Sequence, residues 1–149
     1  MPPHGRFPVT IDAPVDTVWP WVATLEQHVE WSPKPYTIEW IAGEPNMVGS
    51  RFRSVGPIPG DRHRQNEGEI TERVEHERFA LRADDDDGPF MNTFELRPVD
   101  GGTEVTFELA FPKMRGIRAL LAPIVFATVG SVDNRKRMQL LKQAVEGSS

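Results

Sequence analysis

The sequence contains no cysteine and no long apolar run, and each absence excludes a class of protein. Without cysteine the chain can form neither a disulfide nor a thiolate site. The longest nearly uncharged stretch, residues 119–132, is too short to span a bilayer and includes Pro123. Residues 1–6 lack the apolar stretch of a secretory signal. We therefore expect a cytoplasmic protein with no transmembrane segment.

Positive charge is also scarce, and this bears on the kind of partner. The formal net charge is −5, which disfavours a nucleic-acid partner. The charge is uneven, because residues 113–142 carry seven basic side chains and one acidic side chain, Asp133. The length of 149 residues, with 38% hydrophobic residues and no repeat or linker, fits one globular domain over residues 1–149.

The first thirty residues have the pattern of a strand followed by two short helices. Alternating apolar residues predict a strand over residues 6–12. A helix is expected to start with Pro14, where a missing N–H costs nothing. Pro20 falls inside this helix and predicts a kink, because proline removes one hydrogen bond. A second short helix or turn is expected at about residues 28–31.

Strand patterns dominate the middle of the chain, and a helical pattern dominates its end. Six strands are expected, at residues 36–42, 50–55, 66–74, 78–83, 90–99 and 103–111. Ile70 and Val74 should share one face, and residues 84–88 should form a hairpin tip. A long helix should run from Pro123 to about Val145. The order of strand, helix pair, six antiparallel strands and long helix indicates an α+β fold.

The usual signatures of metal and catalytic sites are missing. The DDDDG stretch at 84–88 fails as a calcium loop, because Phe94 would occupy the position of the closing glutamate. The four histidines have no metal-binding spacing, and His28 is expected at the surface. No nucleophile elbow or phosphate-binding loop is present. We expect no metal or other cofactor and assign no catalytic residue.

Several longer motifs resemble one known superfamily over nearly the whole chain. They are IDAPVDTVWPWVATLEQHVEWSP at 11–33, GSRFR at 49–53, GGTEVTFEL at 101–109 and ALLAPIV at 119–125. These motifs resemble the START-related, birch-pollen-allergen-like superfamily (SRPBCC), in particular its polyketide cyclase/dehydrase-like branch. The resemblance implies a helix-grip fold, in which a curved seven-stranded antiparallel sheet wraps around the long C-terminal helix. It also implies a cavity for an apolar small molecule between the sheet and that helix.

The strand alternation suggests which residues would reach this cavity. Five residues should point from the strands toward the long helix: Phe52, Asn92, Phe94, Phe107 and Phe111. Three more would flank the entrance: Trp31, Tyr36 and Trp40. Asn92, the polar member, could orient a ligand carbonyl or hydroxyl, or it could be an ordinary satisfied core residue. Core packing is the alternative for each aromatic residue, including Trp19 and Trp21 of the first helix.

The long helix offers one charged candidate for the site. Arg135 falls on the same helix face as Gln139 and Lys142, which suggests a solvated surface. It lies about one turn past Ser131 and could instead reach the cavity mouth and hold an anionic head group.

Three functional hypotheses remain. The first is a protein that binds an apolar, lipid-like or polyketide-like small molecule. The second is a polyketide aromatase/cyclase or dehydratase, which would need an acid/base pair in the cavity. The third is an interaction module, for example a homodimer that pairs along a strand edge.

Overall fold

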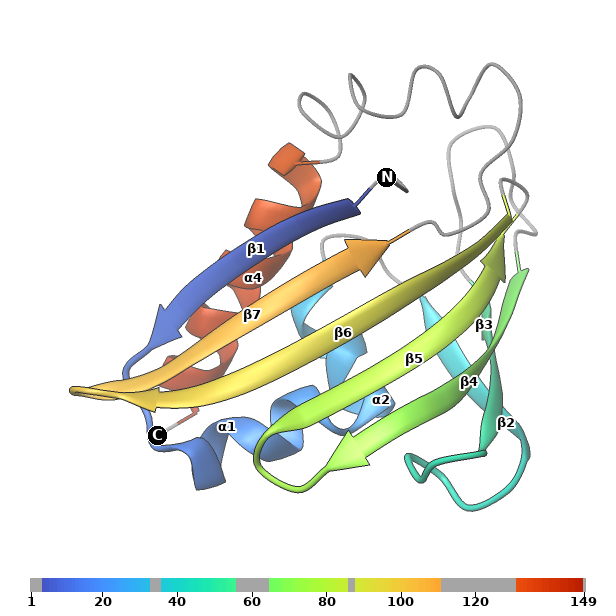
Figure 1. The fold of residues 1–149 in the computed structure, drawn as a ribbon, viewed down its shortest axis with the longest axis horizontal. Helices are drawn as coiled ribbons and strands as arrows, with labels where there is room; N and C mark the ends of the chain where they lie inside the picture. The colour runs from blue at the N-terminus through green and yellow to red at the C-terminus, as the bar shows by residue number, and fades with distance from the viewer. Residues whose placement is uncertain (1–3, 33–35, 56–64, 86–87, 111–130, 149) are drawn as a thin grey trace.

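One antiparallel sheet forms the body of the molecule (Figure 1). The computed structural model describes residues 4–32, 36–55, 65–85, 88–110 and 131–148. The strands are β1 (His4–Ile11), β2 (Thr37–Ala42), β3 (Arg51–Val55), β4 (Gln65–Val74), β5 (Arg78–Asp85), β6 (Gly88–Val99) and β7 (Gly102–Ala110). They lie in the order β1-β7-β6-β5-β4-β3-β2, and all neighbours are antiparallel. The predicted seven-stranded sheet is therefore confirmed.

The helices within the described residues lie on one side of this sheet (Figure 1). They are α1 (Val15–Val22), α2 (Leu25–His28), the single 3₁₀ turn η1 (Val29–Trp31) and α4 (Ser131–Gly147). α4 packs along β1 and against η1, while α1 reaches β6 and β7. This is the helix-grip α+β arrangement expected from the sequence. The predicted start of the long helix at Pro123 lies outside the described residues.

The two short helices differ from their predicted bounds. α1 begins at Val15, because Pro14 keeps an extended backbone (ψ 159°) and forms the N-cap. The helix ends two residues after the exposed Pro20, where the Ala23 N–H donates to the Trp19 carbonyl over 2.8 Å. α2 begins at Leu25, ahead of the predicted turn at 28–31, and the chain then tightens into η1.

Two irregularities in the sheet change the pattern of its faces. The β2–β3 register shifts between Trp40 and Ala42, and the β4–β5 register shifts between Ile70 and Glu72. A bulge of this kind reverses the alternation of side chains that follow it. Ile70 is consequently fully buried while Val74 is 40% exposed, so the prediction that they share a face was wrong.

The β5–β6 hairpin is also longer than predicted. Asp85 pairs with Gly88, so the strands extend into the stretch that the sequence assigned to the hairpin tip. Residues 86 and 87 lie outside the described residues.

The core lies between the inner face of the sheet and the helices. It combines alternate strand residues with one stripe of α4 and the buried side of α1, and includes Ile11, Val105, Phe79, Leu81, Met138, Leu141, Val145, Val18, Trp19 and Val22. Trp19 is therefore a core residue, and its indole N–H donates to Glu75 over 3.1 Å. Near the C-terminal end of α4, the Glu146 carboxylate accepts a hydrogen bond from the Asp12 N–H over 2.9 Å. This bond connects α4 to the segment that follows β1.

Candidate functional site

Aromatic rings gather on the inner face of the sheet, opposite α4. Phe94 of β6 and Phe107 of β7 are cross-strand partners, and their rings stack at a centroid distance of 4.8 Å. Trp31 of η1 meets Phe94 edge-on at 5.9 Å. All three side chains are 1% exposed or less. We call these three residues the aromatic cluster.

Arg137 of α4 places a guanidinium over this aromatic cluster. Its guanidinium carbon lies 5.1 Å from the ring centroid of Trp31, 5.2 Å from that of Phe107 and 5.9 Å from that of Phe94. Burial lowers the pKa of Arg137, although a guanidinium remains protonated at any physiological pH. Its Nε atom is enclosed and has no hydrogen-bond partner within the described part of the chain. The site therefore holds a positive charge, which the aromatic rings stabilise through cation–π contact.

His28 packs against the aromatic cluster and is uncharged. It is 1% exposed, and its ring centroid lies 4.5 Å from that of Trp31 and 5.2 Å from that of Phe94. Its Nε2–H donates to the Val22 carbonyl over 2.6 Å. Burial, together with the charge of Arg137, lowers the pKa of His28 to about 3. The prediction that His28 lies at the surface was wrong, because α2 turns this residue toward the sheet.

Two further polar groups face the same region. Asn92 lies two residues before Phe94 on the inner face of β6, is 8% exposed, and its Oδ1 has no hydrogen-bond partner among the described residues. Tyr36, just before β2, interacts electrostatically with Arg137. Burial raises the pKa of the Tyr36 phenol, and the charge of Arg137 partly opposes that rise.

The structure separates the predicted site residues into two groups. Trp31, Phe94 and Phe107 are together, with Asn92 on the same strand face. Phe52 of β3 is buried in the same core but lies three strands from β6, where Trp40 packs edge-on against it at a centroid distance of 6.0 Å. Phe111 lies outside the described residues.

Arg135 is exposed, and its ligand contact stays a prediction. It borders a shallow hollow of about 350 Å³ beside Arg6, Phe7 and Met138, at the edge of β1.

Sequence reasoning missed Arg137 and the buried state of His28, although the helical period carried a signal for both. Arg137 precedes Leu141 and Val145 by one and two helical turns, and both of these residues are fully buried. His28 lies three residues from both Leu25 and Trp31, which are also buried. In each case a polar side chain occupies a position in phase with an apolar stripe.

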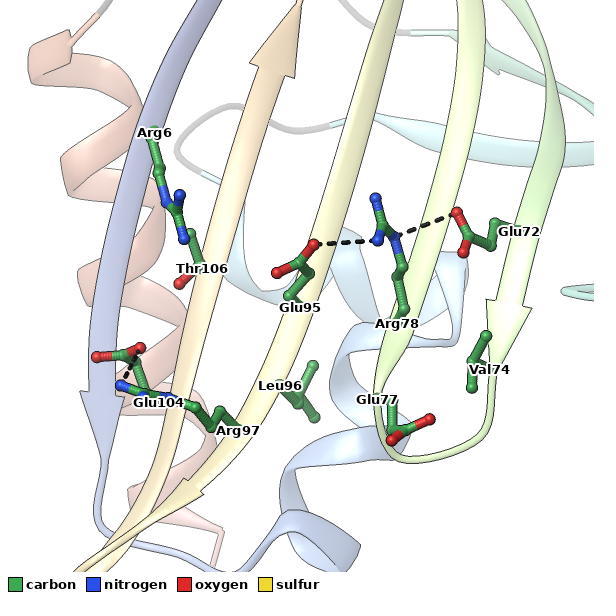
Figure 2. A pocket seen from close by; sticks show the side chains of 10 residues that line it. All are labelled: Arg6, Glu72, Val74, Glu77, Arg78, Glu95, Leu96, Arg97, Glu104 and Thr106. Carbon is green, nitrogen blue, oxygen red and sulfur yellow. Dashed lines mark hydrogen bonds and ion pairs between the residues drawn. The ribbon is translucent and has the colours of Figure 1, made fainter.

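A larger hollow, of about 650 Å³, lies on the outer face of the sheet (Figure 2). Charged side chains dominate its lining. Arg78 bridges Glu72 and Glu95, each at 3.2 Å, and Arg97 pairs with Glu104 at 3.0 Å. Exposed ion pairs of this kind contribute little energy. The outer face has little apolar surface for an apolar molecule to contact. The inner face of the sheet is therefore the better candidate for a ligand-binding site.

The described residues contain neither a cluster of metal ligands nor a membrane-spanning helix. Within them, no three or more histidine, cysteine or acidic side chains are grouped as metal ligands. No helix in the same residues has both the length and the apolar character needed to cross a membrane.

The fold and the inner-face site define a helix-grip protein with polar groups buried among aromatic rings. The family model described as polyketide cyclase/dehydrase and lipid transport matches residues 4–146. The chain therefore belongs to this family, which confirms the superfamily inferred from the sequence motifs. Comparison with curated proteins gave no match.

Solved structures share the fold at low sequence identity. A protein from Rhodobacter sphaeroides is 19% identical with a TM-score of 0.75, over 98% of this chain and 93% of that one. A protein from Thermus thermophilus is 20% identical with a TM-score of 0.72, over 99% of each chain. A protein from Mycobacterium smegmatis is 18% identical with a TM-score of 0.71, over 99% of this chain and 93% of that one. These likenesses show the fold alone.

Proposed function

We propose that this protein binds an apolar small molecule, lipid-like or polyketide-like, between the sheet and α4. The observation that carries the proposal is the aromatic cluster with two enclosed polar atoms, Arg137 Nε and Asn92 Oδ1, that have no partner among the described residues. Buried polar atoms nearly always have a hydrogen-bond partner. A bound ligand would supply one. Family membership supports the same conclusion, because the family includes lipid transport proteins.

Apolar burial would provide most of the binding free energy. A ligand that buries ~200 Å² of apolar surface gains roughly 5 kcal/mol before the cost of ordering. Trp31, Phe94 and Phe107 would form the contact surface, with Asn92 as the orienting polar group. Tyr36, Trp40 and Phe52 would extend this surface toward β2 and β3.

A polyketide aromatase/cyclase or dehydratase is the second candidate, and one observation favours it. Arg137 and Tyr36 interact electrostatically, so a guanidinium and a phenol lie near the same aromatic surface. The guanidinium could stabilise an enolate, and the phenol could donate a proton. His28 offers no base for such a reaction, because its Nε2–H is committed to Val22 and its other nitrogen has a pKa of about 3. Binding is therefore the better-supported function.

Contact quenching of tryptophan fluorescence tests the binding proposal. Bromonaphthalene is neutral and apolar, and its heavy atom quenches an indole that it touches. We expect saturable quenching in the unmodified protein and loss of the saturable component in Trp31→Phe. Trp19→Phe is the matched control, because Trp19 is equally buried but donates to Glu75 at the turn between β4 and β5. Quenching that rises without saturation, or that both variants lose equally, would contradict the proposal. Native mass spectrometry of the purified protein would then identify any ligand that co-purifies.

A further inference from the structure

We infer that the ligand carries one carboxylate, and that Arg137 binds it. This inference rests on the proposed function and adds a chemical class to it. No carboxylate among the described residues interacts with the guanidinium, and the ionisable side chains that do are Tyr36 and the neutral His28. Arg137 is partly buried and its Nε atom is enclosed. A cation in such a place without a counter-ion is costly, so a ligand anion would relieve that penalty.

The geometry of Arg137 suits an acceptor in the plane of the guanidinium. Trp31 and Phe107 approach the guanidinium carbon at nearly equal distances, 5.1 and 5.2 Å. A cation–π contact supplies no hydrogen-bond acceptor, so the N–H groups of the guanidinium still need acceptors. The enclosed Nε–H has no acceptor among the described residues. A carboxylate is planar and matches a guanidinium edge with two parallel hydrogen bonds.

The surroundings favour an anion whose remaining part is apolar. His28 is neutral and directs its N–H to Val22, so it neither competes for the carboxylate nor repels the guanidinium. Phe94 and Phe107 lie beneath the guanidinium and present apolar surface on the same side. An acid with an aromatic or aliphatic body would satisfy both the charge and the rings. Asn92, two residues along β6 from Phe94, could accept a hydrogen bond from a hydroxyl on that body.

A matched pair of probes separates this inference from the proposed function. Bromonaphthoate and its methyl ester share one apolar body and one heavy-atom quencher, and they differ in charge. In the unmodified protein at pH 7.5 we expect the acid to bind about tenfold or more tightly than the ester, since hydrogen bonds between charged partners are strong. Saturable binding of the ester with no preference for the acid would overturn the carboxylate inference and leave the proposed function standing. Failure of both probes to bind would overturn both.

Variants of α4 assign the preference to one residue. Arg137→Met keeps much of the apolar stem and removes the charge, so the preference for the acid should fall below about threefold while ester binding persists. Lys136→Met is the matched control, because Lys136 is the neighbouring residue on the same helix, carries the same charge and is exposed. An unchanged preference in Arg137→Met, or an equal loss in Lys136→Met, would contradict the assignment. Should Arg137→Met fold poorly, Arg137→Lys keeps the positive charge and should retain part of the preference for the acid. A well-folded Arg137→Lys variant with no preference for the acid, or with a preference above that of the unmodified protein, would contradict the assignment.

Discussion

The burial of His28 predicts a specific loss of stability in acid. The folded protein holds this imidazole neutral with a pKa of about 3, whereas an unfolded chain has the ordinary value near 6.5. Between these two values the unfolded state binds more protons. The free energy of unfolding should therefore fall as the pH falls, by up to about 1.4 kcal/mol per pH unit. From pH 7.5 to pH 4.5 the contribution of His28 amounts to roughly 2.5 kcal/mol.

The variant His28→Gln isolates this contribution. Glutamine keeps an N–H that can reach the Val22 carbonyl but does not titrate. Other groups also lose stabilising contacts in acid, among them Glu75, whose pKa is lowered first of all by its bond from Arg73. These groups titrate in both proteins and cancel in the difference.

Urea unfolding at several pH values provides the measurement. We expect the unmodified protein to lose about 2.5 kcal/mol more than His28→Gln between pH 7.5 and pH 4.5. Parallel pH profiles for the two proteins would mean that the imidazole titrates freely. That result would refute the packing of α2 and η1 against Phe94.

Three further predictions concern stability and local opening. Gly68→Ala should destabilise the protein by about 1–3 kcal/mol in thermal unfolding, because the new Cβ would lie 2.5 Å from the Phe52 ring and 2.6 Å from a backbone oxygen. Gly147→Ala, whose Cβ would meet nothing within 4 Å, should change stability by less than about 0.5 kcal/mol, and equal effects of the two would contradict this packing. Asn92→Leu should stabilise the ligand-free protein by about 1 kcal/mol, because it removes a buried acceptor that has no partner in the described structure, and a lower melting temperature would count against that reasoning. Glu146→Gln should speed hydrogen exchange at the Asp12 amide, because it weakens the hydrogen bond from the Asp12 N–H. Acid that protonates Glu146 should have the same effect, since this hydrogen bond is the first cause of the lowered pKa of Glu146. An unchanged exchange rate would show that other contacts hold α4 in place.

The sequence predicted the elements of this fold well, because most of them show their period directly. Strict two-residue alternation in β6 and β7 identified Phe94 and Phe107 as inward residues, and both are buried. The prediction failed at Val74 because one extra residue in β4 shifts the alternation, and a bulge leaves no mark in the hydrophobic pattern. The start of α2 was missed because a helix of four residues is too short to show a period.

The candidate site was harder to predict, because it depends on how a helix is rotated against the sheet. Arg135 and Arg137 are only two residues apart, and the choice between them depends on which face of α4 meets β1 and η1. Leu141 and Val145 indicate that face in the sequence. Charged residues are seldom buried, so the sequence alone favours an exposed position for Arg137, although it lies on the same face. The structure shows the aromatic rings that accommodate it. The pairing of β1 with β7 is likewise non-local, and no pattern in the sequence predicted it.

Binding of an apolar molecule between the inner face of the sheet and α4 can be observed through intermolecular NOEs between a bound neutral naphthalene and the protein. We expect NOEs to the ring protons of Trp31, Phe94 and Phe107. NOEs to the side chains of the outer hollow, such as Val74 and Arg78, with none to those three rings, would contradict it.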